Sequence, residues 1–379
     1  MYIKIRFPML LTLLMLVSLV MFACNKKEAD VDVVPDSEEV QVTVRLGTDA
    51  SGVDDKSFNA SAWRGITRFY GDTPENPLKQ GSHYDYIISN NTDKYVSNLR
   101  LMSEGGYSLV IVTGFTWADA LSQVAPDYPQ QKFMIVDVAG LPNDAKNIME
   151  VIYAEEQGAF LAGVAAALQA KEVGAEPKFG FIGGIPGAVI THFQVGYMQG
   201  ILTISPDAEI LDYYANDWAD PAKAKIQAEA WFDSGVYAIF SAAGSTGNGA
   251  IQVAKESRQR GRDVWAIGVD SDQYGEGLYE EGKSAILTSM IKRVDAATEL
   301  ALMNVRDETF QAEVVRLDLA NSGVGLPENN PNLSDAILAE VKDYEQKVIN
   351  GEIVVDNTVA AFISAGHLGE GLTILARDD

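Results

Sequence analysis

Strand-like and helix-like segments alternate along most of this 379-residue chain, and this alternation limits the possible folds more than any other feature. Short apolar runs such as Ser108–Thr113 and Lys132–Val136 are typical of strands buried on both faces. Each run is followed by a segment whose apolar residues have helical spacing. Strands that alternate with helices form parallel sheets through right-handed crossovers. The sequence therefore predicts an α/β protein with doubly wound parallel sheets.

Two series of alternating segments follow one another. The first ends in a buried strand closed by Asp137, and the second begins at Val151 and ends in a buried strand closed by Asp270. A chain of this length exceeds one ordinary hydrophobic core. We therefore expect two lobes of similar construction that close on each other like a clamshell.

The C-terminal part is mixed, and we expect it to complete both sheets by crossing between the lobes several times. Its pattern predicts a helix over Leu287–Leu302 and a strand or buried turn over Thr358–Ala365. The expected first lobe comprises residues 41–150 with about 272–308, and the expected second lobe comprises residues 151–271 with about 309–379.

The first 23 residues have the pattern of a targeting segment. Two basic residues precede an apolar run over Met9–Ala23, and directly after this run comes Cys24, the single cysteine of the chain. One cysteine cannot form an internal disulfide, so we expect cleavage before Cys24 and acylation of this residue. The alternative is an uncleaved transmembrane anchor, for which the run is short. Residues 24–40 would then tether the domain to a membrane of the cell envelope, outside the cytoplasm.

The loop after the first expected strand, Gln41–Leu46, is the strongest candidate for a ligand-binding wall. Asp49 lies at the carboxyl end of this strand, Ser57 is the expected N-cap of the next helix, and Phe58 lies in the first helical turn. In open α/β sheets, ligands bind outside the carboxyl ends of the strands. In the alternative interpretation, Asp49 and Asp55 only cap the loop and Phe58 belongs to the core.

Carboxylates and aromatic side chains recur at the expected strand ends. Asp137 and Asp270 each close a buried strand, and Phe58, Phe115 and Trp218 lie in or just after such loops. One carboxylate accepts two hydroxyl hydrogen bonds at once, which suits the vicinal diol of a sugar. An aromatic face buries a planar ring. The combination predicts a site for a sugar and a flat ring, although each aromatic residue taken alone also fits the core.

Other chemistries fit the sequence poorly. A formal net charge of −24 makes nucleic acid a poor partner, because binding it depends on Lys and Arg. The segment Gly277–Ser284 matches the phosphate-loop pattern, but Glu280 and Glu281 would face the phosphate. The three histidines show no paired metal-ligand spacing, and the chain has no nucleophile elbow with a histidine nearby. We therefore expect no metal and no cofactor.

Residues 48–63, TDASGVDDKSFNASAW, resemble the signature of the basic membrane protein family, the substrate-binding lipoproteins that include the purine nucleoside receptors. Later segments resemble further blocks of this family in the same order, among them GFTWADALSQVAPDYPQQKFMIVD, KFGFIGGIPGAVITHFQVGY, FSAAGSTGNGAIQVAKE and TSMIKRVDAA. The resemblance spans roughly residues 41–300. It implies a type I periplasmic-binding-protein fold, with two doubly wound lobes joined by a multi-crossing hinge, in a receptor that serves an ABC permease.

The resemblance also implies roles for individual residues. Phe58 would stack on the base, and Asp137 and Asp270 match the carboxylates that hold ribose hydroxyls. Lys292 matches a lysine near the sugar, and Gly244 matches a backbone contact. Together, the strand-end pattern and the resemblance give the expected ligand-binding set: Asp49, Phe58, Asn59, Phe115, Asp137, Trp218, Gly244, Asp270 and Lys292.

We therefore expect a monomeric, lipid-anchored receptor that captures a nucleoside and does no chemistry on it. Among nucleosides, a purine nucleoside is the expected ligand. Some relatives in the family bind riboflavin, which also combines a flat ring with a polyol, so riboflavin is an alternative ligand. A nucleoside or glycoside hydrolase is a second alternative, because the three strand-end aspartates could converge as paired carboxylates. An interaction or adhesin role, in which the lobes present a surface, is a third.

Overall fold

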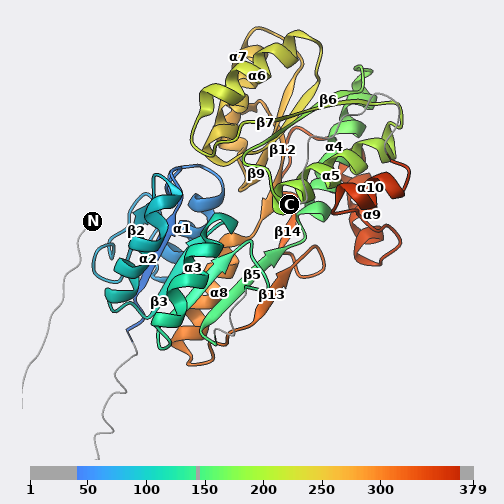
Figure 1. Ribbon diagram of the computed structural model, residues 1–379. Coiled ribbons are helices and arrows are strands. Elements are labelled where there is room, and N and C mark those ends of the chain that lie inside the picture. The colour runs from blue at the N-terminus through green and yellow to red at the C-terminus, as the bar shows by residue number, and fades with distance from the viewer. Residues whose placement is uncertain (1–40, 142–145, 368–379) are drawn as a thin grey trace, which may run out of the picture. The chain divides into compact units, whose positions relative to one another are not determined.

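A computed structural model of the protein describes residues 41–141 and 146–367 (Figure 1). The expected targeting segment 1–23, the tether 24–40 and the acylated Cys24 lie outside the described residues. Within the described residues, no helix has both the length and the apolar character needed to span a bilayer.

The first lobe is built on a six-stranded parallel sheet with the strand order β13-β5-β4-β3-β1-β2. Its helices cover both faces, because α1 packs with α8 and α2 packs with α3 (Figure 1). The strands are β1 (Val44–Thr48), β2 (Tyr84–Ile88), β3 (Leu109–Thr113), β4 (Lys132–Val136), β5 (Ile148–Tyr153) and β13 (Val314–Leu317). The helices are α1 (Phe58–Phe69), α2 (Tyr95–Glu104), α3 (Ala118–Val124) and α8 (Val294–Arg306), with the 3₁₀ turns η1 (Thr92–Lys94), η2 (Phe115–Trp117) and η3 (Ala125–Asp127).

The second lobe repeats this plan with the strand order β14-β12-β9-β8-β6-β7, in which only the short β14 is antiparallel to its neighbour among the described strands. Helices α4 and α5 pack together, and α6 packs with α7. The strands are β6 (Lys178–Gly183), β7 (Glu209–Tyr214), β8 (Ala238–Ala242), β9 (Trp265–Asp270), β12 (Ile286–Lys292) and β14 (Val324–Gly325). The helices are α4 (Glu155–Val173), α5 (Ala188–Ile204), α6 (Pro221–Asp233), α7 (Asn248–Gln259), α9 (Asp335–Ile349) and α10 (Val359–Ser364), with the 3₁₀ turns η4 (Gly244–Gly247) and η5 (Tyr274–Gly277).

The central strands are apolar along their whole length because both faces of each sheet are covered. In β3, Leu109 and Ile111 join the core under α1 and α8, whereas Val110 and Val112 join the core under α2 and α3. Successive side chains of a strand point to opposite faces, so a strand in this position needs an apolar residue at every position. This requirement explains the continuous apolar runs in the sequence.

The chain crosses between the lobes three times in the described residues. It passes from β5 to α4 at Ala154, from β12 to α8 at Arg293, and from β13 to β14 through residues 318–323. Because of these crossings, the segments that make up each lobe differ from those expected from the sequence. The segment 272–308 contributes β12 to the second sheet and α8 to the first lobe, and the segment 309–379 contributes β13 to the first sheet.

Two elements differ from the sequence expectation. The expected helix Leu287–Leu302 is wrong in its first half, because β12 occupies Ile286–Lys292 and α8 begins at Val294. The expected strand or buried turn at Thr358–Ala365 is the helix α10, which the Thr358 hydroxyl caps by accepting the Ala361 N–H at 3.1 Å. A short apolar run is compatible with either structure until its packing partners are known.

The segment that matches the phosphate-loop pattern folds as an antiparallel hairpin of β10 (Leu278–Glu280) and β11 (Lys283–Ser284). A phosphate loop instead joins a strand to the N-terminus of a helix. The hairpin therefore removes the structural basis for phosphate binding here.

Candidate functional site

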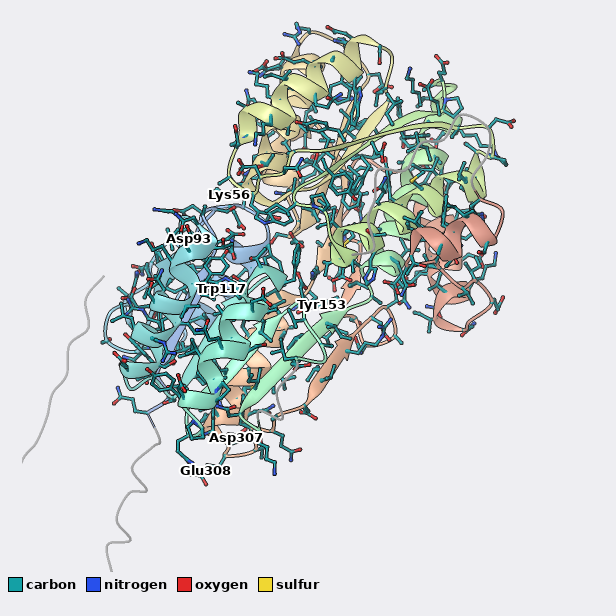
Figure 2. The ribbon with its side chains drawn as sticks, in the orientation of Figure 1. Lys56, Asp93, Trp117, Tyr153, Asp307 and Glu308 are labelled. Carbon is teal, nitrogen blue, oxygen red and sulfur yellow. The ribbon has the colours of Figure 1, made fainter. Side chains whose placement is uncertain are left out.

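The carboxyl ends of strands from both lobes face each other across one cavity. It is lined by residues that follow β1, β3 and β4 in the first lobe and by residues at the ends of β8, β9 and β12 in the second. Lys56, labelled in Figure 2, lies in the loop between β1 and α1, where the first lobe meets the second. All nine residues expected from the sequence line this cavity: Asp49, Phe58, Asn59, Phe115, Asp137, Trp218, Gly244, Asp270 and Lys292. Their roles in binding stay a prediction.

Asp137 and Asp270 turn into the cavity at the ends of β4 and β9. Both have left-handed backbone conformations, with φ of 71° and 63°, which are unfavourable for residues other than glycine. Burial raises the pKa of the Asp270 carboxyl above its ordinary value, and Lys292 and Ser57 offset part of this effect. The Ser57 hydroxyl donates to Asp270 Oδ2 at 2.5 Å, so one oxygen of this cavity-lining carboxylate already has a donor from the first lobe.

The cavity has aromatic walls from both lobes. Phe58 lies in the first turn of α1, and Phe115 follows β3. The Phe115 ring meets the Trp218 ring of the second lobe edge to face, with centroids 6.2 Å apart and planes at 76°. Gly184 makes room for Trp218, because a Cβ at this position would lie 2.0 Å from the indole ring. Phe193 of α5 lines the same cavity, although the sequence analysis did not identify it.

The N-terminus of α1 is fixed by Asp55. Ser57 occupies the expected N-cap position, but its hydroxyl is used by Asp270. The Asp55 carboxylate instead accepts the backbone N–H groups of Ser57, Asn59 and Ala60 at 2.8–2.9 Å. Burial raises the pKa of Asp55 to about 7 against the opposing effect of these three donors. This network holds Phe58 and Asn59 at the edge of the cavity.

Asp49 and Asn59 form a second polar group on the first-lobe wall. The Asn59 amide donates to Asp49 Oδ1 at 3.1 Å and accepts from the Thr113 hydroxyl at 2.5 Å. The Ser51 N–H also donates to Asp49 Oδ1, at 2.9 Å. Burial raises the pKa of Asp49, and the donors from Ser51 and Asn59 oppose this rise. The group presents hydrogen-bonding atoms beside the aromatic walls.

Lys292 ends β12 and is buried between two carboxylates. Its Nζ lies 2.5 Å from Asp137 Oδ1 and 2.9 Å from Glu155 Oε1. Burial alone would lower the pKa of Lys292, but Asp137, Glu155 and Asp270 outweigh this effect and raise it. The ammonium therefore stays charged and neutralises part of the negative charge of the cavity.

Hydrogen bonds across the cavity join the β1–α1 loop to the second lobe. The Ser51 hydroxyl donates to the Trp218 carbonyl at 2.9 Å, and the Asn248 amide donates to the Asp55 carbonyl at 3.0 Å. The Gln273 amide donates to the Lys56 carbonyl at 3.0 Å. These bonds hold the lobes together on the cavity side, as expected for a closed clamshell.

Glu155, Ser51 and Phe193 are three residues at or beside the cavity that are not among the nine expected from the sequence. Glu155 lies in the acidic first turn of α4, where acidic residues are common. Ser51 lay inside the first motif, where its spacing gave no separate signal. Phe193 sits among the apolar residues of α5, and nothing in that pattern distinguishes it from a core residue.

Comparisons with known proteins agree with this geometry. A family model described as "ABC transporter substrate-binding protein PnrA-like" (Bmp) matches residues 43–358. The chain belongs to this family. The Bmp chain is therefore a substrate-binding protein of ABC transporters and not an enzyme, so the hydrolase alternative is set aside.

Relatives of this Bmp protein cover most of its length. It is 35% identical over 360 residues to a "CD4+ T-cell-stimulating antigen" of Listeria innocua serovar 6a, covering 93% of this chain and 98% of the relative. It is 36% identical over 318 residues to the "ABC transporter nucleoside-binding protein BmpA" of Lactococcus lactis subsp. cremoris, covering 81% and 87%. A solved ABC-transporter solute-binding protein from Aeropyrum pernix superposes with a TM-score of 0.72 at 26% identity, covering 85% and 96%. The expected type I periplasmic-binding-protein fold is thus confirmed.

Proposed function

We propose that this Bmp protein captures a purine nucleoside between its two lobes and delivers it to an ABC permease. The observation that carries the proposal is the cavity that combines the buried carboxylates of Asp137 and Asp270 with aromatic walls from both lobes. The name of the Lactococcus lactis relative, a nucleoside-binding protein, supports the same ligand class.

The geometry suits a nucleoside in two parts. The base would lie between Phe58 and Trp218, whose faces bury a planar ring. The ribose hydroxyls would donate to Asp137 and Asp270, because a carboxylate accepts from a vicinal diol. Lys292 would support the sugar end by holding Asp137 in place.

The charge of the cavity favours a neutral ligand. Four aspartates line it (Asp49, Asp55, Asp137 and Asp270), against the single ammonium of Lys292 among the described lining residues. A 5′-phosphate would bring further negative charge into this buried space, which is unfavourable. Inosine should therefore bind, and its 5′-monophosphate should not compete with it.

Delivery and location complete the proposal. Substrate-binding proteins of ABC transporters pass their ligand to permease subunits, so a membrane-bound permease is the expected partner. Acylation of Cys24 would hold the domain near that partner at the cell envelope. The tether over residues 24–40 would give it the freedom to dock.

The test is native mass spectrometry of the full-length protein in detergent, purified without added ligand. Titration calorimetry with inosine, guanosine, adenosine, cytidine and riboflavin follows. We expect a co-purified or tightly binding purine nucleoside. Binding of riboflavin alone would move the function to vitamin capture, and binding of none of these compounds would contradict the proposal.

A further inference from the structure

Glu155 is the first residue of α4 and lies directly after the crossing from β5. Its Oε1 lies 2.9 Å from Nζ of Lys292, the last residue of β12 before the second crossing. The two side chains are 2% and 1% exposed. This buried ion pair therefore joins two of the three chain crossings between the lobes. The third crossing follows β13, whose Arg316 lies 3.5 Å from Glu156.

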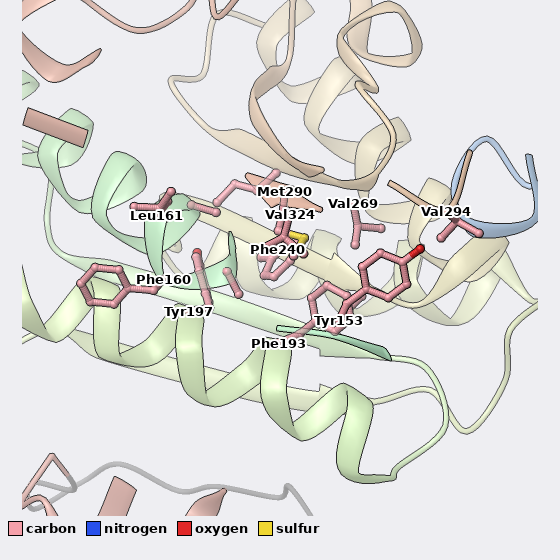
Figure 3. Packing of buried hydrophobic residues seen from close by; sticks show 14 of the residues in the cluster. Tyr153, Phe160, Leu161, Phe193, Tyr197, Phe240, Val269, Met290, Val294 and Val324 are labelled. Atoms are coloured by element: carbon pink, nitrogen blue, oxygen red, sulfur yellow. The ribbon is translucent and has the colours of Figure 1, made fainter. Parts of the chain in front are cut away.

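Lys292 connects this hinge pair to the cavity. The same ammonium contacts Asp137 at 2.5 Å, so two of its three donors serve the two carboxylates. The rings of Phe58, Tyr153 and Phe193 surround the ammonium at 4.9–5.5 Å from their centroids. Figure 3 shows the Tyr153 and Phe193 rings close together in this part of the core. The ammonium is thus confined to a position between Asp137 and Glu155.

Glu155 also connects the hinge to a group that protons can reach. Its Oε2 lies 3.1 Å from His192 Nδ1 of α5, and Glu156 of α4 approaches the same nitrogen at 4.0 Å. The His192 side chain is 24% exposed. The charged groups that face it are Glu155 and Glu156 from α4 and, beyond them, Lys292 from β12. His192 does not line the cavity, although its neighbour Phe193 does.

We infer that Glu155 is a positioning residue: it shares the Lys292 ammonium with Asp137 and so couples the cavity to the protonation of His192. While Glu155 shares the Lys292 ammonium, Lys292 interacts less strongly with Asp137. The Asp137 carboxylate can then accept a stronger hydrogen bond from a ligand hydroxyl. When His192 gains a proton, it competes with Lys292 for the Glu155 carboxylate. The ion pair between Lys292 and Asp137 then becomes stronger. The effect on a ligand rests on the proposed function, whereas the coupling itself does not.

The ligand-free test follows the imidazole of His192 by NMR in the full-length protein. The chain has three histidines, so a His192→Gln variant assigns its signal. In Glu155→Gln, we expect the pKa of His192 to fall, because its nearest carboxylate is lost. In Asp137→Asn, we expect a smaller fall, because Lys292 then turns to Glu155 and withdraws it from His192.

The decisive comparison is a double-mutant cycle. The effect of Asp137→Asn on His192 should disappear in the Glu155→Gln background, because Glu155 transmits it. An effect of equal size in both backgrounds, or no effect in either, would overturn the inference. Asp49→Asn is the control, since Asp49 lines the same cavity without an ion pair to Lys292 among the described contacts.

The ligand test measures inosine affinity from pH 6 to 8. We expect Glu155→Gln to bind about tenfold more weakly or worse and to lose most of the pH dependence of the wild type. Glu155→Asp should recover part of both. Glu299→Gln, which breaks a separate ion pair to Arg68, should behave like the wild type.

A Glu155→Gln protein that melts earlier but keeps wild-type affinity and pH profile would show a merely structural role and sink the inference. A wild type that binds no nucleoside would instead sink the proposed function. In that case, the NMR cycle still decides the role of Glu155.

Discussion

Two of the six described non-glycine residues with positive φ are among those proposed to grip the ligand. Asp137 and Asp270 carry left-handed conformations, each of which costs on the order of 1–3 kcal/mol for a residue with a side chain. Their sheets hold them there because β4 and β9 are buried strands with neighbours on both sides. The conformation ends each strand abruptly and turns the carboxylate into the cavity. A glycine would relieve the strain but would remove the acceptor.

Gly184 gives a prediction at the same scale. A methyl group there would lie 2.0 Å from the Trp218 ring, so Gly184→Ala must displace the indole. We expect the free energy of unfolding to fall by about 1–3 kcal/mol, the usual cost of overpacking, and inosine affinity to fall with a change in tryptophan fluorescence. Gly275→Ala is the matched control, because nothing lies within 4 Å of its added Cβ. Equal affinities in the two variants would contradict the role of Trp218.

The first turn of α1 contributes Phe58 and Asn59 to the first-lobe wall of the cavity. Asp55 accepts two of its backbone N–H groups and that of the N-cap Ser57, so Asp55→Ala should lower the free energy of unfolding by about 1–2 kcal/mol, as loss of a helix cap does. Because Phe58 and Asn59 depend on this turn, inosine affinity should fall as well. Denaturant unfolding and calorimetry measure the two effects.

Ser334→Ala provides the control for this prediction. Ser334 caps α9 by accepting the Ile337 N–H at 3.3 Å, away from the cavity. This variant should lose stability through the same mechanism while binding inosine normally. If both variants bind equally well, the α1 turn does not position the site.

The contact between α5 and α4 predicts how stability depends on pH. Burial alone would lower the pKa of His192, but Glu155 and Glu156 outweigh it and raise this pKa above its ordinary value. The stabilisation is therefore fully present below about pH 6.5, the ordinary value for histidine, and is lost as the pH rises through the raised folded value. The difference in unfolding free energy between the wild type and His192→Gln should be largest at pH 5.5 and shrink by pH 8.5.

Denaturant unfolding at several pH values provides the measurement. The same difference measured in the Glu155→Gln background should be smaller, because His192 has then lost its nearest carboxylate. A difference that grows with pH would contradict the assigned interaction.

Elements with strong local signals were predictable from the sequence. The strand Lys132–Val136 has the expected bounds, and the strand expected at Ser108–Thr113 begins one residue later, at Leu109. The segment before α8 was mistaken for helix because β12 is buried along nearly its whole length and shows no strict alternation of apolar and polar residues, and only its place between β9 and β14 makes it a strand. The nine site residues were found through strand ends and the family resemblance. Glu155 was missed because its partner Lys292 is distant in sequence.

The whole molecule depends on contacts that join the lobes on the cavity side. Ser51 and Asn248 each donate one hydrogen bond across it. The double variant Ser51→Ala/Asn248→Ala should destabilise closure by about 0.5–1.5 kcal/mol for each bond. In small-angle scattering, we expect a larger radius of gyration without ligand and the wild-type value with saturating inosine.

The control for closure is Ser82→Ala/Asn350→Ala, which removes hydrogen bonds within the lobes. It should match the wild type with and without inosine. Identical scattering from all three proteins in both states would contradict a closure that depends on these bonds.

The most direct measurement compares inosine with 2′,3′-dideoxyinosine in the wild type and in Asp270→Ala. If Asp270 accepts a ribose hydroxyl, the wild type should prefer inosine by at least about tenfold, and the variant should lose most of this preference. Asp272→Ala, an exposed aspartate in the next turn, should keep it. Equal binding of the two ligands by the wild type, or an unchanged preference in Asp270→Ala, would contradict the proposed ribose site.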